Sequence, residues 1–150
     1  MLAYDADLEL FRDNFKRFMS EHVAPHYEQW ELEGIMPRSI WNLLGENGYL
    51  CIDVPEEYGG YGVPTHYSLM LVEESARAGF CALSTGISCH SEIAAPYILH
   101  IGTESQKQYW LPKMVSGEVV GAIGMTEPGA GSDLQAMRTN AILNDDHYLL

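Results

Sequence analysis

The sequence predicts a mainly α-helical fold, with a helical-bundle domain over residues 1–117 and the first strands of a truncated β domain over residues 118–150. Through the first two-thirds of the chain, apolar residues recur at steps of three and four, the period of an amphipathic helix. After Gly117 the sequence becomes β-rich, and the chain stops inside a predicted strand. Because strands need partners, we expect the 150 residues to be a fragment of a longer protein.

The first two helices are predicted from spacing and from proline. One is expected from Asp5 to Glu31, capped by Asp5, with an inner face at helical steps formed by Leu8, Phe11, Phe15, Phe18, Met19 and His22. Pro37 is suited to the first turn of a second helix, where a missing N–H costs nothing. That helix should end near Gly48 and bury Ile40, Leu43 and Leu44.

A loop and a third helix come next. Residues 54–65 read VPEEYGGYGVPT, and this density of glycine and proline predicts irregular backbone. Thr65 can cap a helix from His66 to Arg77. Its expected inner face is Leu69, Val72 and Ala76.

Two further helices complete the predicted bundle. Small and apolar residues from Ala82 to Ile101 indicate a buried fourth helix. Thr103 and Gln106 match a capping box, which opens a fifth helix that Gly117 ends.

The remaining residues predict strands. The segment from Glu118 to Met125 contains EVVGAIGM and suits a strand after a helix stop. A second strand is expected from Met137 to Leu143, and Asn144-Asp145-Asp146 is a turn signal. A third begins with His147 and runs to Leu150.

Charge and cysteine content limit the classes of partner and compartment. The net charge of −13 disfavours binding to nucleic acid or to an anionic membrane. There is no basic leader and no apolar run of about 20 residues, so we expect a soluble cytoplasmic protein without membrane insertion. Cys51, Cys81 and Cys89 are odd in number and widely spaced, which predicts reduced thiols rather than a disulfide framework or a metal site.

Residues 124–133, GMTEPGAGSD, are the strongest candidate for chemistry. A Walker phosphate loop is disfavoured because it requires a lysine, and a Rossmann fingerprint because position 134 is leucine. A third interpretation is a turn after a strand. There Gly129 and Gly131 would take positive φ, backbone N–H groups would bind an anion, and Ser132 would add a hydroxyl. An ordinary glycine-rich turn remains the alternative.

The wider stretch AIGMTEPGAGSDLQAM, residues 122–137, resembles the flavin-contact signature of the acyl-CoA dehydrogenase family. The match includes every residue from Met125 to Asp133. Residues 48–64 (GYLCIDVPEEYGGYGVP) and 101–118 (IGTESQKQYWLPKMVSGE) also resemble segments of that family, so the likeness extends over essentially the whole chain. Within the family the sequence is most similar to the long-chain type.

The resemblance implies an FAD-dependent enzyme that oxidises fatty acyl-CoA to trans-2-enoyl-CoA, with hydride transfer to flavin N5. Electrons would pass to an electron-transfer flavoprotein, and the full-length protein would be a homotetramer or homodimer. The family places its catalytic base beyond Leu150, so this chain would contain no catalytic residue and would be inactive alone. A middle β domain and a C-terminal four-helix domain would follow the helical domain.

The same resemblance implies which residues contact the cofactor. Met125 and Thr126 would touch the isoalloxazine ring, while Gly131 and Ser132 would face the pyrophosphate, and Ser132 would also reach the acyl-CoA. The complete implied set is Ile123, Gly124, Met125, Thr126, Glu127, Pro128, Gly129, Ala130, Gly131 and Ser132. For Glu127 and Asp133 we expect hydrogen bonds that brace the loop rather than catalysis.

Other titratable groups give weaker signals. His22 and His26 are four residues apart, but Pro25 intervenes and no third ligand is near, so a metal site is disfavoured. Ser88 and Cys89 beside His90 do not form a nucleophile pair, because adjacent residues on a helix point apart.

Two acid pairs and one apolar group have two interpretations each. For Glu56-Glu57 and Glu73-Glu74 we expect solvated surface. Core packing is expected for a set of apolar residues that could also line an acyl tunnel: Leu83, Ile87, Tyr97 and Ile98.

Three other functions remain open. An acyl-CoA oxidase or a flavin monooxygenase of the same fold shares parts of the motif. The chain could also be a non-catalytic helical binding module that retains a family-like loop.

Overall fold

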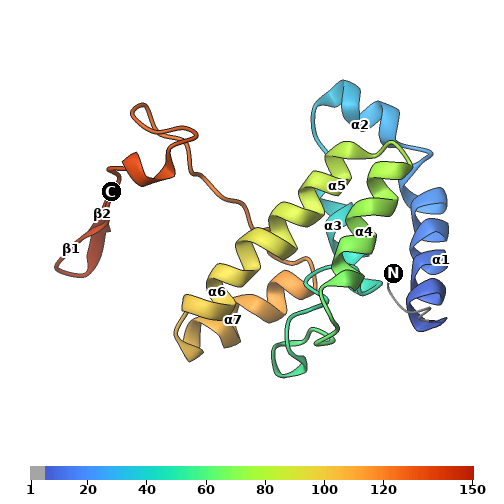
Figure 1. Ribbon diagram of the computed structural model, residues 1–150, viewed down its shortest axis with the longest axis horizontal. Helices are drawn as coiled ribbons and strands as arrows, with labels where there is room; N and C mark the ends of the chain where they lie inside the picture. Colours follow the sequence, from blue (N-terminus) through green and yellow to red (C-terminus); the bar gives the residue numbers. More distant parts are fainter. Residues whose placement is uncertain (1–5) are drawn as a thin grey trace.

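The computed structural model describes residues 6–150 and confirms the mainly α-helical fold class (Figure 1). Asp5, the expected first cap, lies outside the described residues. The α-helices are α1 (Ala6–Phe18), α2 (Tyr27–Glu33), α3 (Arg38–Glu46), α4 (His66–Arg77), α5 (Cys81–Ile87), α6 (Ala95–Ile101) and α7 (Glu104–Val115). Shorter turns of 3₁₀ or π helix are η1 (Met19–Val23), η2 (Glu56–Tyr58), η3 (Ser88–Ala94) and η4 (Leu134–Ala136).

The single helix expected from Asp5 to Glu31 is wrong, because the chain turns at residues 24–26 between η1 and α2. Pro25 has no N–H and a fixed φ, so it interrupts the helical hydrogen bonds. The predicted inner face is confirmed from Leu8 to Met19. His22 was also expected there, but its side chain is 44 % exposed, and Val23 at the end of the π-helical turn is buried in its place.

Helices α3 and α4 have the predicted positions, but α4 presents a different face to the core. Pro37 immediately precedes α3, and Thr65 immediately precedes α4 without a side-chain cap bond. Leu69 was expected inside and is 54 % exposed, whereas Leu71, Glu74 and Ser75 are buried. The other two expected inner residues of α4 are also not core residues: Val72 is partly exposed and Ala76 is exposed.

The predicted fourth and fifth helices are confirmed, but the expectation that the fourth is buried is wrong in part, because Ile93, Tyr97 and Ile101 are exposed. Elements α5, η3 and α6 follow one another without a break from residue 81 to residue 101. Thr103 caps α7 in a capping box, in which the Gln106 N–H donates to Thr103 Oγ1 at 3.3 Å and the Thr103 N–H donates to Gln106 Oε1 at 2.8 Å. Gly117 follows α7 with a φ of 73°, a left-handed value that favours glycine.

The core consists of two neighbouring apolar clusters. The larger joins α1, α3, α4 and α5 around the fully buried Phe15, Leu44 and Leu83. The smaller joins α6, α7 and the loop at residues 51–58 around Leu111 and Met114. Helix α4 packs against α1 and α5, and α6 packs against α7, as Figure 1 shows. Within residues 6–150, no helix combines the length and the apolar character that crossing a membrane requires.

The β region differs from the prediction. The strand expected from Glu118 to Met125 is wrong, because these residues run as unpaired irregular backbone. Strand β1 (Ile142–Asn144) is shorter than the strand expected over 137–143 and shifted toward the C-terminus, and β2 (His147–Leu149) ends one residue early. They pair antiparallel with Asn144 opposite His147, and Asp145 turns with a φ of 53°, which confirms the turn signal.

The hairpin stands apart from the helices at the end of an extended connection (Figure 1). All six strand residues are exposed, and among the described residues no further strand pairs with them. Since a strand is stable only when its backbone groups are paired, segment 118–125 has the composition of a strand without the partner that would make it one.

Candidate functional site

Three of the ten predicted flavin-contact residues, Ile123, Gly124 and Met125, line one wall of a cavity of about 500 Å³, whereas residues 126–132 do not line it. The opposite wall is formed by α6 and α7 through Tyr97, Ile98, Trp110 and Met114. The near wall is the irregular segment 121–125, which contributes Ile123, Gly124 and Met125, and Met137 also reaches the cavity. The fold therefore brings together the start of the motif and two residues that were considered for an acyl tunnel.

Two hydrogen bonds donated by backbone N–H groups hold the segment where it enters this cavity. The Val119 N–H donates to the Lys113 carbonyl at 3.0 Å, and the Gly121 N–H donates to Nδ1 of His90 at 2.9 Å. A side chain at position 121 would not fit, because a Cβ would lie 2.8 Å from Cβ of Ala94 and 2.8 Å from Cε of Met114. Glycine is thus favoured here by a close approach of the backbone to the end of η3 and to α7.

Beyond Gly121 the backbone offers donors to a ligand. In the described part of the chain, the N–H groups of residues 122–126 donate to no protein acceptor. Gly124 has open space where a Cβ would stand, and Thr126 is exposed. A free row of donors beside an apolar wall suits a flat ring with a polar edge.

The motif then folds into a tight turn. The N–H of Glu127 donates to the Ala130 carbonyl at 3.0 Å, and the reverse bond has the same length, with Pro128 and Gly129 at the tip. The expectation of positive φ at Gly129 and Gly131 is wrong, since neither lies in the left-handed region. The two-way pairing sets the turn instead, and it uses the Ala130 N–H that an anion site would need.

The carboxylate of Glu127 braces this turn, as predicted. It accepts the Arg138 N–H at 2.6 Å, the Thr139 N–H at 2.9 Å, and the Thr139 hydroxyl. The Thr139 hydroxyl, followed by the two backbone donors, lowers the pKa of the Glu127 carboxyl. For Asp133 the bracing expectation is not confirmed, because its exposed carboxylate makes no hydrogen bond within residues 6–150 and only its backbone carbonyl accepts the Ala136 N–H at 3.1 Å.

The four residues considered for an acyl tunnel separate into two groups. Leu83 and Ile87 are buried in the larger cluster, which confirms core packing for them. Tyr97 and Ile98 line the cavity, and Ile98 also packs against the smaller cluster. The sequence reasoning missed Trp110 and Met114, although their spacing of four residues on α7 was a signal that they share a face.

It also missed the role of His90. This side chain is fully buried, with Nε2 3.0 Å from the Met114 carbonyl and 3.5 Å from Sγ of Cys51. Burial lowers the pKa of His90 and raises the pKa of the Cys51 thiol to about 12. The pair is therefore neutral, and neither group is a nucleophile.

The acid pairs also differ from each other. Glu56 and Glu57 are exposed, which confirms solvated surface, and Glu73 is exposed as well. For Glu74 the prediction is wrong, because its side chain is 8 % exposed and lies 3.4 Å from Nε of Arg12. Among residues 6–150, no three His, Cys, Asp or Glu side chains are grouped as metal ligands.

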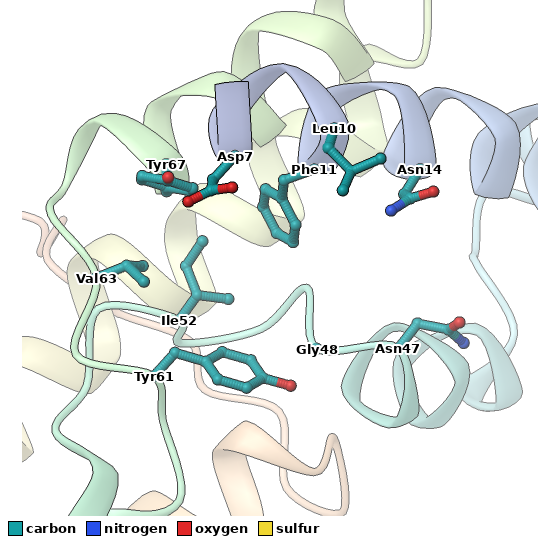
Figure 2. A pocket seen from close by; sticks show the side chains of 10 residues that line it. All are labelled: Asp7, Leu10, Phe11, Asn14, Asn47, Gly48, Ile52, Tyr61, Val63 and Tyr67. Atoms are coloured by element: carbon teal, nitrogen blue, oxygen red, sulfur yellow. The ribbon is translucent and has the colours of Figure 1, made fainter. Parts of the chain in front are cut away.

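A second cavity, of about 490 Å³, lies between α1, the loops at residues 47–52 and 61–63, and the start of α4 at Tyr67. Figure 2 shows Phe11 and Ile52 facing each other across it, with Tyr61 at the far wall and Asn14 and Asn47 at one side. None of the predicted cofactor residues lines this cavity.

Comparison with known proteins identifies the family. Residues 5–118 match the family model for the acyl-CoA dehydrogenase N-terminal domain. A long-chain specific acyl-CoA dehydrogenase from Sus scrofa is 38 % identical over 147 residues, which cover 98 % of this chain and 34 % of the relative. The chain thus spans about a third of the length of that curated relative.

Solved structures agree in fold as well as sequence. An acyl-CoA dehydrogenase from Geobacillus kaustophilus superposes with a TM-score of 0.90 at 45 % identity and covers 98 % of this chain and 38 % of its own. An acyl-CoA dehydrogenase from Bacillus anthracis in complex with FAD has a TM-score of 0.86 at 32 % identity, over 97 % of this chain and 26 % of its own. The chain belongs to the acyl-CoA dehydrogenase family.

Proposed function

We propose that this chain forms the helical wall and the flavin-facing segment of an FAD-dependent acyl-CoA dehydrogenase. The observation that supports it is the cavity in which segment 121–125 faces α6 and α7. The backbone donors of residues 122–126 are free on one side, and Tyr97, Ile98 and Trp110 give an apolar surface on the other.

The residues present fit the cofactor. Met125 and Thr126 would hold the ring, with backbone donors at its polar edge. Gly131 and Ser132 would hold the pyrophosphate, since both are exposed and a Cβ at Gly131 would meet no other atom within 4 Å. When bound, FAD supplies the acceptor for the hydride that leaves the β-carbon of the acyl chain, at flavin N5.

The chain's own residues would then position the cofactor and the substrate and exclude water from the site. Donors fixed by the backbone stabilise negative charge without reorganising during the reaction. The apolar helical wall keeps water from the reacting carbons, and the thioester product would be a trans-2-enoyl-CoA. By resemblance to the family, Ser132 would contact the acyl-CoA as well as the cofactor, and its exposure is compatible with this.

The proposal extends to parts that lie outside residues 1–150. The catalytic base, the second wall of the flavin site and the contacts of a homotetramer or homodimer would come from those parts, so this chain alone would be inactive. An electron-transfer flavoprotein would accept the electrons. We also propose the division into domains at Gly117, which is supported by a family match that ends at residue 118.

The compartment is a separate question. A cytoplasmic location stays our prediction, although the Sus scrofa relative is by name a mitochondrial protein. Fractionation of cells that express the full-length gene, with the product followed by immunoblot, decides between these locations.

The visible spectrum of the full-length gene product tests the proposed function. Protein purified without added cofactor should show a flavin band that bleaches anaerobically when a fatty acyl-CoA is added. Oxygen consumption without any other electron acceptor would indicate an acyl-CoA oxidase or a monooxygenase instead. A colourless protein that takes up no FAD on reconstitution would refute the proposal and leave a helical binding module.

A further inference from the structure

One buried side chain, His90, connects three separate parts of the fold. It comes from the π-helical turn between α5 and α6. One ring nitrogen reaches the end of α7 at the Met114 carbonyl, and the other reaches Gly121 on the segment that enters the cavity. The ring also packs edge-on against Trp41 of α3, with centroids 5.7 Å apart.

These bonds determine which ring nitrogen carries the proton. Gly121 offers an N–H, so Nδ1 must be the acceptor and cannot be protonated. Met114 offers a carbonyl, so Nε2 must carry the proton and donate it. His90 is thus held as a neutral imidazole in one tautomer, with a backbone partner at each nitrogen.

The Gly121 bond is the last anchor before the motif. Between it and the turn that begins at Glu127, no N–H of the intervening residues 122–126 is bonded to the described protein. The path of those five residues is therefore set by two fixed ends. At one end is His90, and at the other is the turn between Glu127 and Ala130.

We propose that His90 is a positioning residue that places segment 122–126 against the cofactor by holding the Gly121 N–H at Nδ1. This inference rests on the proposed function, since it assigns the residue that orients the same site. His90 touches neither cofactor nor substrate, and it acts through the backbone at Gly121.

Two substitutions separate this role from ordinary core packing. In His90→Asn, the amide oxygen replaces Nδ1 and can still accept the Gly121 N–H, but nothing reaches Met114. In His90→Gln, the amide nitrogen replaces Nε2 and can still donate to Met114, but the acceptor for Gly121 is lost. Both variants remove the ring and both keep one of its two bonds.

The measurement is the Kd of FAD for full-length apoprotein, beside the Tm of each apoprotein. We expect His90→Gln to weaken FAD binding about tenfold or more, as an unmet buried donor should. We expect His90→Asn to stay within about threefold of the unchanged protein. Leu71→Ala is the control: it changes a buried residue of α4, a helix that contributes no residue to the cavity lining, so it should lower Tm and leave the Kd unchanged.

Equal loss of FAD affinity in the two His90 variants, or a greater loss in His90→Asn, would overturn the inference. If neither variant folds, Gly121→Ala gives the answer, because its methyl group would meet Ala94 and Met114 and lift the N–H away from Nδ1. An unchanged Kd in Gly121→Ala would also overturn the inference. Failure of the unchanged protein to bind FAD would instead refute the proposed function itself.

Discussion

Two adjacent glutamates on α4 offer a direct test of how burial changes the contribution of an ion pair to the stability of the fold. Glu74 is nearly enclosed and lies 3.4 Å from Nε of Arg12 on α1 and 3.7 Å from Nε of Arg77. Glu73, one residue earlier, is 57 % exposed and pairs with the same Arg77 at the surface. We predict that Glu74→Gln destabilises the fold and that Glu73→Gln does not.

The magnitude follows from the exposure of the partners. Breaking a fully buried ion pair costs about 3–5 kcal/mol, and an exposed pair contributes about 0.2–1 kcal/mol. Arg12 is 27 % exposed and Arg77 is 67 % exposed, so solvent screens part of the interaction. The buried Nε of Arg12 has no hydrogen-bond partner and faces the Glu74 carboxylate, while Nη1 of the same guanidinium pairs with Glu9 at 2.6 Å. We therefore expect a loss of about 1–3 kcal/mol for Glu74→Gln and less than about 0.5 kcal/mol for Glu73→Gln.

Thermal unfolding of the full-length gene product measures the difference. Each kcal/mol of lost unfolding free energy should lower Tm by roughly 2–4 °C for a protein of about 150 residues or more. Amide exchange in α1 and α4 locates the effect, because this pair joins the two helices. Equal Tm values for the two variants would refute the argument that burial, rather than charge alone, decides the contribution.

Three further predictions concern the site. Gly124→Ala should leave the apoprotein Tm unchanged, since a Cβ there meets nothing within 4 Å, yet it should weaken FAD binding several-fold; an unchanged Kd would place the flavin elsewhere. Glu127→Gln should speed amide exchange at Arg138 and Thr139. Because the Glu127 pKa is lowered, the bracing hydrogen bonds in the unchanged protein should be fully present at any pH above the ordinary pKa of a glutamate. They should be lost as the pH falls through the lowered pKa. Protection of the Arg138 and Thr139 amides that does not vary with pH would contradict this. Burial, with Arg38 nearby, lowers the His90 pKa, so unfolding free energy should be full above about pH 6.5 and decline below it by up to about 1.4 kcal/mol per pH unit; His90→Asn should flatten that decline.

Short-range signals in the sequence were sufficient for several features. The bounds of α4, the capping box that starts α7 and the turn at Asp145 depend on residues within a few positions of one another. The motif at residues 124–133 was also recognisable, because its residue types and spacing are specific. Bracing by Glu127 was predicted from the same stretch and is present in the structure.

Other features depended on partners that are distant in the sequence. Which face of α4 points inward depends on its packing against α1 and α5, including the approach of Glu74 to Arg12 about sixty residues away, and not on the apolar period of α4 alone. The strand predicted over 118–125 did not form, because β propensity has no effect without a neighbouring strand to pair with.

The sequence by itself determined the positions of most helices, the capping box of α7 and the family motif, since each depends on residues close together in the chain. Only the tertiary structure showed that His90 fixes Gly121 and that Trp110 faces Met125 across the cavity. The residues of these two pairs are 31 and 15 positions apart in the chain. They lie near each other because packing of η3, α6 and α7 brings together residues that no local pattern relates.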